Sequence, residues 1–307
     1  MFRRIARTAL FALAGLVLFA CGLQIAGSAS TPVPPREESN VRLATLNVHW
    51  VALRMQSGPW SPAGWDARRP AMAATLLDIS PDILALQEAE SFPDTNRNGR
   101  NLVVEGLMED LDGYAIAATG PPTEFPPTQP ILYRADRFEM VDQGWFFFSR
   151  TPDQIYSRTF NGGFAAFASW AQFRGRDGGL FRVVNMHTDY ASRSNRLKSA
   201  ALVRDRVRPW IEAGERVVVL GDMNAMRGAA TLRRIEEAGI RFLPIPGATV
   251  HFNRGINLLG AIDHIGLGPG LKAVSQPGVV RNRVDGVWPS DHYPVFVDLA
   301  TDPEPGN

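Results

Sequence analysis

Short apolar segments alternate with polar loops from residue 41 onward, and most of them have the length of a β-strand. Val41–Val48 alternates apolar and polar side chains, which is typical of a strand with one buried face. Residues 216–220 are almost wholly apolar, as in a strand that is buried on both faces. Similar patterns predict further strands at 82–87, 131–133, 144–148, 164–173, 181–186, 261–267 and 294–299.

Helical spacing of apolar residues occurs in a few longer segments. Asp66–Ile79 shows it and stops before Pro81, which cannot continue a helix. The other predicted helices cover residues 101–111, 192–213 and 229–238. No repeat of solenoid period appears, and the composition does not change after residue 40. The sequence therefore predicts one α/β domain, in which mixed sheets pack face to face and helices lie outside.

The first 30 residues have the layout of a bacterial signal peptide. Arginines precede an apolar run, Thr8–Ala20, and small residues follow it. Leu18–Cys21 resembles a lipoprotein cleavage box, so that a lipid on Cys21 would anchor the protein in a membrane. Conventional cleavage near Ala29 and an uncleaved signal anchor are the alternatives. Each predicts an exported protein, which would be a periplasmic or cell-surface lipoprotein or a secreted protein.

Composition narrows the class of function. Hydrophobic residues make up 45% of the 307 residues, enough for a sizeable core. The 32 basic and 31 acidic residues give a net charge of +1, which argues against a strong non-specific nucleic-acid binder. With a single cysteine the chain can form no internal disulfide. We expect a Pro-rich tether at 31–40, a catalytic domain at 41–301 and a tail at 302–307, in a monomer.

Metal-binding and acid–base side chains recur at the ends of the predicted strands, where function is often found. Each alone is more often a turn former than a functional group, but the chain has six such places. They carry Asn47; Glu88; His187 and Asp189; Asp222 and Asn224; Asp263 and His264; and Asp291 and His292. Carboxylate oxygens suit a hard divalent ion such as Mg²⁺, which can neutralise charge on a phosphoryl group during hydrolysis.

The strings around these residues resemble the endonuclease/exonuclease/phosphatase superfamily of deoxyribonuclease-like, metal-dependent phosphoesterases. They are TLNVHW, LQEAE, NMHTDY, GDMNA, AIDHIG and PSDHYPV, and they extend from about Val41 to Leu299. The resemblance implies a four-layer α/β sandwich, with two packed mixed sheets flanked by helices. It also implies a hydrolase of phosphoester bonds that uses Mg²⁺, with Mn²⁺ as the alternative ion. Glu88, assisted by Asn47 and Asp291, is expected to hold this ion.

The resemblance also implies catalytic roles. Asp222 would orient or activate the attacking water, and Asn224 would hydrogen-bond the phosphate from the same face of an extended segment. His292 would be the base or stabilise the phosphate, with Asp263 on its other ring nitrogen. His187 would hydrogen-bond the phosphate or protonate the leaving group. A zinc site on the two histidines is the alternative use of these residues.

Three further residues are candidates for substrate contact: Asp189, Arg196 and His251. Arg196 follows NMHTDY on a predicted helix, where it would either clamp a phosphate or remain a solvated charge of the helix face. His251, in ATVHFN, would line the rim of the site. Thr188 and Ser199 stand where related bacterial proteins often carry Leu and Gln, so the contacts to the substrate stay open.

Residues 94–105 (DTNRNGRNLVVE) satisfy the spacing of an EF-hand calcium loop. The ligands of a structural Ca²⁺ would be Asp94, Asn96, Asn98 and Glu105 through their side chains and Arg100 through its backbone carbonyl. Only two of these side chains are anionic, and a strand rather than a helix precedes the loop. A loop that caps the following helix is therefore the alternative.

The substrate stays open among nucleic acids, phospholipids and small phosphoesters. A nuclease competes with a sphingomyelinase-like lipid or inositol phosphoesterase, and the near-neutral charge slightly favours the second class. The alternative of another class is a catalytically inactive binding domain on the same scaffold. Clustered charges at one site argue against it, because charge burial is costly without a function that needs it.

Overall fold

The computed structural model describes residues 2–89, 91–92, 101–176 and 178–300, which form two six-stranded sheets and a short two-stranded one. The first sheet contains, in spatial order, β13 (Gly278–Val279), β14 (Val295–Ala300), β1 (Asn40–Asn47), β3 (Ile83–Gln87), β6 (Ile131–Arg134) and β5 (Tyr114–Ala117). The second contains β11 (Arg241–Phe242), β12 (Asp263–Leu267), β10 (Arg216–Asp222), β9 (Leu180–His187), β8 (Phe167–Gly175) and β7 (Phe138–Phe147). The short sheet pairs β2 (Val51–Ala52) with β4 (Ser91–Phe92).

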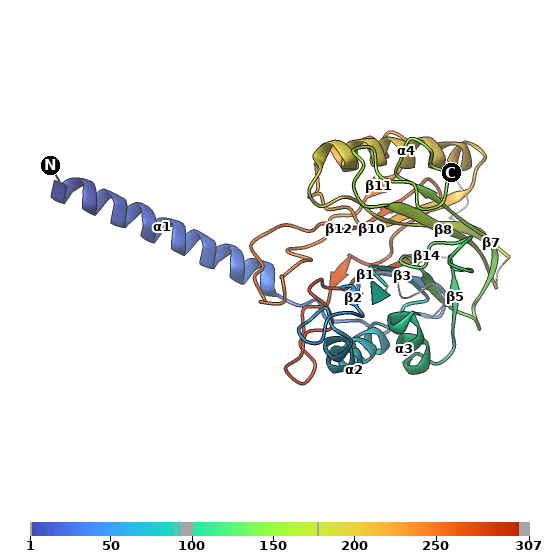
Figure 1. Cartoon of the computed structure of the whole chain (residues 1–307), viewed down its shortest axis with the longest axis horizontal. Helices are drawn as coiled ribbons and strands as arrows, with labels where there is room; N and C mark the ends of the chain where they lie inside the picture. Colours follow the sequence, from blue (N-terminus) through green and yellow to red (C-terminus); the bar gives the residue numbers. More distant parts are fainter. Residues whose placement is uncertain (1, 90, 93–100, 177, 301–307) are drawn as a thin grey trace.

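The two large sheets pack face to face, and helices cover both outer faces (Figure 1). The first sheet is covered by α2 (Pro62–Ile79) and α3 (Leu102–Asp110), and the second by α4 (Arg193–Glu212) and α5 (Ala230–Glu236). Apolar side chains fill the space between the sheets, among them Leu43, Ile83, Phe173, Val183 and Leu220. This arrangement confirms the predicted four-layer α/β sandwich.

Both sheets are mixed, and their central strands run parallel. In the first sheet β1 is parallel to β3, and in the second β9 is parallel to β10. The neighbours β14 and β12 run antiparallel to β1 and β10. They therefore begin at the edge where β1 and β10 end, which brings the ends of four strands and the starts of two others together.

Local sequence determines where the helices begin and end. The side chain of Ser61 accepts the N–H of Gly64 and Pro62 occupies the first turn, so α2 starts a few residues before the predicted Asp66. The helix ends at Ser80, which is left-handed (φ 47) and donates its N–H to Leu76. In α4, Ser192 is the N-cap, as the predicted boundary requires.

The other predicted elements are present, and the differences have simple causes. β7 begins at Phe138, well before the predicted residue 144, because its first half is largely exposed and lacks the alternation of a half-buried strand. The sequence pattern misses β5, β11 and β13, since strands of two to four residues are too short to show a period.

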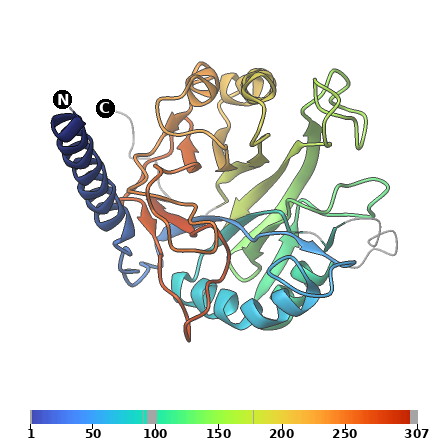
Figure 2. The same ribbon diagram turned by 60° about the vertical axis from the view of Figure 1, so that its left-hand side comes forward.

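Residues Phe2–Ser28 form a single helix, α1, which projects from the domain (Figures 1 and 2). Among the helices that the structure describes, it alone is long and apolar enough to cross a membrane, over Leu10–Ser28. A signal sequence has the same character, so the composition of this helix does not separate the alternatives for the N-terminus.

The segment after α1 differs from the predicted free tether. Thr31 donates its N–H to the carbonyl of Val279 at 2.9 Å, and Val33 packs against the apolar residues on the α2 side of the first sheet. Nη1 of Arg36 lies 2.7 Å from Oδ1 of the buried Asp82. A proline-rich chain is extended, so its remaining polar groups can pair along the edge of the domain.

Gly221 precedes Asp222 in β10 and has a φ of +129. A Cβ at this position would overlap the carbonyl oxygen of Met186 on β9. We expect Gly221→Ala to lower the free energy of unfolding by about 3 kcal/mol or more, because both backbone and space exclude a side chain. Gly214 also has a positive φ (+81) but has no atom within 4 Å of its Cβ position. Gly214→Ala should therefore cost only about 1 kcal/mol; equal losses in urea unfolding would contradict this account.

Candidate active site

The predicted site residues meet at the shared edge of the two sheets. Asn47 is the last residue of β1, and Glu88 follows β3 directly. In the second sheet, His187 and Asp222 end β9 and β10 and are paired in register. Asp222 is also paired with Asp263, the first residue of β12. The register of the second sheet alone therefore places three site residues side by side.

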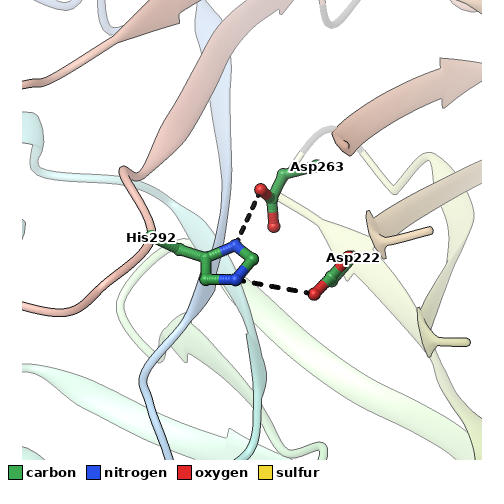
Figure 3. A group of neighbouring side chains, drawn as sticks. All are labelled: Asp222, Asp263 and His292. Atoms are coloured by element: carbon green, nitrogen blue, oxygen red, sulfur yellow. Dashed lines mark hydrogen bonds and ion pairs between the residues drawn. The ribbon is translucent and has the colours of Figure 1, made fainter. Parts of the chain in front are cut away.

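Asp222, Asp263 and His292 form the buried inner part of the site (Figure 3). Nδ1 of His292 lies 2.9 Å from Oδ2 of Asp263, and Nε2 lies 3.8 Å from Oδ2 of Asp222. Burial alone would lower the pKa of His292, but the carboxylates of Asp263, Asp222 and Asp291 together outweigh it and raise that pKa well above its usual value. The predicted contact of Asp263 with His292 is therefore present, and the second ring nitrogen faces Asp222.

Glu88 and His187 form the more accessible outer part. Nε2 of His187 lies 3.8 Å from Oε1 of Glu88 and 3.6 Å from Oδ2 of Asp222. The side chains of Glu88 and His187 are 24% and 25% exposed, whereas that of Asp222 is 2% exposed. A substrate that enters from solvent therefore meets Glu88 and His187 before it reaches the inner part.

Asn47 connects the two parts through its amide nitrogen. Nδ2 lies 3.1 Å from Oε1 of Glu88 and 3.2 Å from Oδ2 of Asp222, while the amide oxygen accepts the N–H of His49 at 3.0 Å. The role of Asn47 as a metal ligand stays a prediction. Its nitrogen faces the carboxylates, so Asn47 positions Glu88 and Asp222.

Three non-glycine residues around the site have left-handed backbone conformations: His49 (φ 60), Glu88 (φ 58) and Asn224 (φ 44). Each costs on the order of 1 kcal/mol, and such residues cluster at functional sites. At Glu88 the turn allows Oε2 to accept the N–H of Trp50 at 3.0 Å. The strained backbone and this hydrogen bond together fix the direction of the carboxylate.

The prediction that Asp222 and Asn224 face the same way on an extended segment is wrong. The strand ends at Asp222, and Asn224 turns back so that its N–H donates to Oδ1 of Asp222 at 2.8 Å. Its side-chain Nδ2 donates to the carbonyl of Thr188 at 2.9 Å. An Asx-type hydrogen bond replaces the strand period on which the prediction rested.

Asp291 lies near the end of the loop that joins β13 to β14. Its side chain is 23% exposed, and Oδ2 lies 4.0 Å from Nε2 of His49. The neighbouring Ser290 donates its hydroxyl to the carbonyl of Asn47 at 2.6 Å and accepts the N–H of His292 at 3.2 Å. Ser290 therefore holds the segment with Asp291 against the end of β1.

The donor set fits a hard divalent cation. Among the residues that the structure describes, the ion pairs of Glu88, Asp222 and Asp291 are with histidines and never with lysine or arginine. Converging carboxylates without such partners suit an oxygen-preferring ion, and partial exposure suits one that keeps water ligands. Asp222, Asp263 and His292 offer a second arrangement, since one ligand atom of each lies within 4.8 Å of the others.

Asp189 and Arg196, predicted as candidates for substrate contact, instead stabilise the loop after β9. Oδ1 of Asp189 accepts the N–H of Ser192 at 2.9 Å, and Oδ2 accepts Nδ2 of Asn195 at 2.7 Å. Nη1 of Arg196 donates to the carbonyls of Asp189 and Tyr190 at 2.8 and 2.9 Å. Loop carbonyls therefore engage Nη1 of the Arg196 guanidinium, and its contact with a substrate phosphate stays a prediction.

His251 does not line the rim of the site, contrary to the prediction. It is 0% exposed, and its ring centroid lies 4.2 Å from that of Tyr293 and 4.4 Å from that of Trp288. Nε2 donates to the carbonyl of Ser290 at 2.9 Å. His251 thus holds Ser290, the residue before Asp291, in place through this hydrogen bond.

Most of the predicted calcium loop lies outside the described residues, and this applies to Asp94, Asn96, Asn98 and Arg100. Asn101 caps α3 with its side-chain oxygen, and Glu105 lies in the first turn of that helix. Both observations agree with the alternative of a loop that caps the helix. Calcium binding stays a prediction.

A buried polar network that none of the six motifs indicates lies beneath the site. Nε2 of Gln87 donates to Oδ1 of Asn185 at 2.7 Å, across the interface between the two sheets. Nδ2 of Asn185 donates to the carbonyl of Leu86 at 2.7 Å. The available signal is an amide residue inside an apolar strand, because such a residue needs a buried partner.

Arg68 of α2 is a second residue that the motifs do not reveal. Its buried guanidinium donates to the carbonyls of Val48, His49 and Pro289 and lies 4.9 Å from the ring of Trp65. Burial lowers the pKa of Arg68 to about 10. The side chain ties the loop after β1 to the segment that carries Asp291.

Comparison with known proteins agrees with this geometry. The family model described as "Endonuclease/Exonuclease/phosphatase family" matches residues 44–292, which is more than half of the chain. The chain belongs to the endonuclease/exonuclease/phosphatase family. This confirms the resemblance of the six motifs and gives the chain a phosphoesterase fold. No curated protein matches the chain at a significant level.

Solved structures with the same fold come from several organisms. An endonuclease/exonuclease/phosphatase family protein from Bacteroides thetaiotaomicron is 24% identical with a TM-score of 0.71, covering 87% of this chain and 100% of that one. A mannosyl-6-phosphatase from the same organism is also 24% identical with a TM-score of 0.71, over 84% and 99% of the two chains. TDP2 from D. rerio, complexed with a single-strand DNA product, is 15% identical with a TM-score of 0.60, over 86% and 100%.

The buried His251 should make the stability of the fold sensitive to acid. Burial lowers the pKa of His251 to about 4, whereas a histidine in the unfolded chain titrates near 6.5. Between these values the unfolded state binds more protons, so stability falls as the pH drops from about 6.5 towards 4. This loss amounts to ~3 kcal/mol. His251→Gln can still donate to Ser290 but does not titrate, so it should flatten the pH dependence of the unfolding free energy. An unchanged slope in urea unfolding at several pH values would refute this role.

Proposed function

We propose that this protein is an exported, Mg²⁺-dependent hydrolase of phosphoester bonds. One observation supports this best: Oδ2 of Asp222 lies 3.8 Å from Nε2 of His292 and 3.6 Å from Nε2 of His187. The two imidazoles beside the Asp222 carboxylate can transfer protons, and the carboxylates of Asp222 and the partly exposed Glu88 offer oxygen ligands for a metal ion. Phosphoester hydrolysis needs both.

Glu88 and Asp291 would hold the ion, with Mn²⁺ as the alternative to Mg²⁺, and Asn47 would keep Glu88 in place. When bound, the ion supplies positive charge to the phosphoryl oxygens and to the leaving oxygen. The hydrogen bonds to Glu88 from Trp50 (3.0 Å) and Asn47 (3.1 Å) hold its carboxylate in one orientation. A ligand oriented in advance costs less to assemble around the substrate.

The remaining groups have roles that follow from their positions. Asp222 orients the attacking water and accepts its hydrogen bond, while His292, polarised by Asp263, stabilises the negative charge of the phosphate or takes the proton. His187 is more exposed and donates to the phosphate or to the leaving oxygen. Asn224 has a second amide hydrogen beyond the one given to Thr188, and we assign it to a phosphate oxygen.

The location is also part of the proposal. The export-type N-terminus and the spanning-type helix Leu10–Ser28 support a protein that acts outside the cytoplasm, retained at a membrane by α1 or by a lipid on Cys21. The monomer is part of the proposal as well.

A lipid or small phosphoester is favoured over a nucleic acid. Base stacking needs exposed aromatic side chains. Phe125, Phe147 and Phe148 of the long loops are at most 8% exposed, whereas Tyr156 and Phe164 are 47% and 84% exposed. The preference therefore rests on the net charge of +1, which gives little attraction for a polyanion. Nuclease activity and an inactive binding domain are the alternatives that the assay below addresses.

Hydrolysis of a bis-aryl phosphodiester tests the proposal. We expect turnover with Mg²⁺, loss of turnover with chelator, and recovery when Mg²⁺ is restored, because the carboxylates need the ion to neutralise the phosphate. Asp222→Ala and His292→Ala should each lower kcat by roughly 10²-fold to 10⁴-fold, since each removes a group that acts on the water or the phosphate.

Asp205→Ala is the matched control, because Asp205 is an exposed carboxylate on α4 whose ion pair is with Arg204 at 2.8 Å. It should leave kcat unchanged. Absence of turnover in the folded, Mg²⁺-loaded protein would favour the inactive binding domain, and normal rates in either site variant would remove the assigned mechanism.

A further inference from the structure

The loop from Phe252 to Gly260 exposes an unusually apolar surface for a domain of near-neutral charge. Phe252, Ile256, Leu258 and Leu259 are 50%, 38%, 41% and 46% exposed, and Met226 is 53% exposed. Met226 belongs to the same surface, because its sulfur lies 3.4 Å from the Cβ position of Gly260. We call these five side chains the apolar rim. Clustered large apolar side chains commonly mark a contact with a membrane or a protein.

The apolar rim borders the active site. Val250, just before the loop, forms a β-bridge with His292, and Asp263 lies just after it. Nδ2 of Asn253 lies 3.5 Å from Nδ1 of His49. Whatever covers the apolar rim is therefore next to the entrance of the site.

The same loop holds the end of α1. Nε2 of Gln24 donates to the carbonyl of Gly255 at 2.7 Å, and the N–H of Asn257 donates to Oε1 of Gln24 at 2.7 Å. Nδ2 of Asn257 donates to the hydroxyl of Ser28 at 2.9 Å. Figure 2 shows this end of α1 against the orange and red segments of the domain. The last turns of α1 are therefore fixed to the loop that carries most of the apolar rim.

The length of α1 places this contact at a membrane surface. Leu10–Ser28 has 19 residues, and the rest of the protein buries only 6% of its most apolar stretch. At 1.5 Å per residue the segment is about 28 Å long, close to the roughly 30 Å of a bilayer's hydrocarbon layer. A helix that spends this length inside the bilayer ends at the headgroups, and the loop bonded to its last turns lies at the same level.

We propose that the apolar rim rests on the outer surface of the bilayer that α1 crosses, so that the active site receives phosphoesters of lipid headgroups. The partner that covers the apolar rim is thus the headgroup region of the membrane. The choice of lipid as substrate class rests on the proposed phosphoesterase function, whereas the docking of the loop does not.

The charge of the loop agrees with contact with a membrane surface. Arg227 and Arg254 are exposed beside the apolar rim, and residues 252–260 include no acidic residue. Basic side chains next to inserted apolar ones are typical of surfaces that bind anionic lipid headgroups. The contacts from Gln24 to Ser28 require that this stretch is retained in the mature protein, and the crossing of the bilayer by α1 requires an uncleaved anchor.

Docking is tested without any assay of activity. The full chain carries Cys21→Ser and one new cysteine, at Leu258→Cys or at Leu180→Cys, each labelled with a fluorescent dye. Leu180 is 40% exposed at the start of β9, the end opposite His187, and serves as the control. The protein is reconstituted in vesicles of phosphatidylcholine and phosphatidylglycerol with nitroxide-labelled headgroups. We expect strong quenching at 258 and little at 180; equal quenching at both positions would overturn the docking.

Substrate class is tested with Leu258→Asp/Leu259→Asp, which places two acids on the anionic surface. In the same vesicles this variant should lose roughly tenfold or more of its turnover of a lipid-anchored aryl phosphodiester. Turnover of the soluble bis-aryl phosphodiester should change by less than about twofold, because neither leucine belongs to the catalytic groups. Leu180→Asp should change neither rate.

The outcomes separate the two proposals. Quenching at 258 without turnover of either substrate would refute the phosphoesterase function and leave the docking in place. Quenching with turnover of the soluble substrate only would overturn the lipid substrate. An N-terminus of the mature protein beyond Ala29 would overturn the docking, because the residues that bind the loop would be gone.

Discussion

Asn185 joins the two sheets directly beneath the active site through hydrogen bonds of 2.7 Å with the side chain of Gln87 and with the carbonyl of Leu86. The chemistry depends on this register, because Glu88 follows a strand of the first sheet whereas Asp222 ends a strand of the second. Apolar packing between the sheets is strong but has no direction. A buried amide that loses its partner costs roughly 1–3 kcal/mol, so the polar contact opposes a slide that the core alone would tolerate.

This constraint explains why the inner part of the site can be so deeply buried. The pairing of Asp222 with both His187 and Asp263 comes from backbone hydrogen bonds of the second sheet. His292 comes from the loop before β14, and its position depends on Ser290, which binds both the end of β1 and the N–H of His292. Each group is placed by backbone structure first, so the cost of bringing the charges together is met when the domain folds.

The sequence predicts the strand ends well and the loops poorly. Asn47, Glu88, His187 and Asp222 are correctly placed, because an apolar run that stops at a polar residue locates the end of a strand. Asp263, predicted within the strand 261–267, is the first residue of β12. Longer-range contacts leave no such trace, and these include the guanidinium of Arg68 and the Gln87–Asn185 bond. His251 differs from its predicted role for the same reason, since its ring packs on Tyr293 from another segment, whereas the partners of Asp189 and Arg196 lie within their own loop.

The distinction between strand ends and loops also accounts for how the proposed membrane-facing surface can coexist with the proposed catalytic site. Asp263 is held by its pairing with Asp222 and by the hydroxyl of Thr249, which accepts its N–H at 3.1 Å. The loop that binds α1 ends before this point, so a change in its apolar side chains does not move the carboxylate. The groups that perform the chemistry therefore depend on sheet register, whereas the encounter with the substrate depends on loop surface. A scaffold divided in this way can keep one reaction while its loops determine where the reaction takes place.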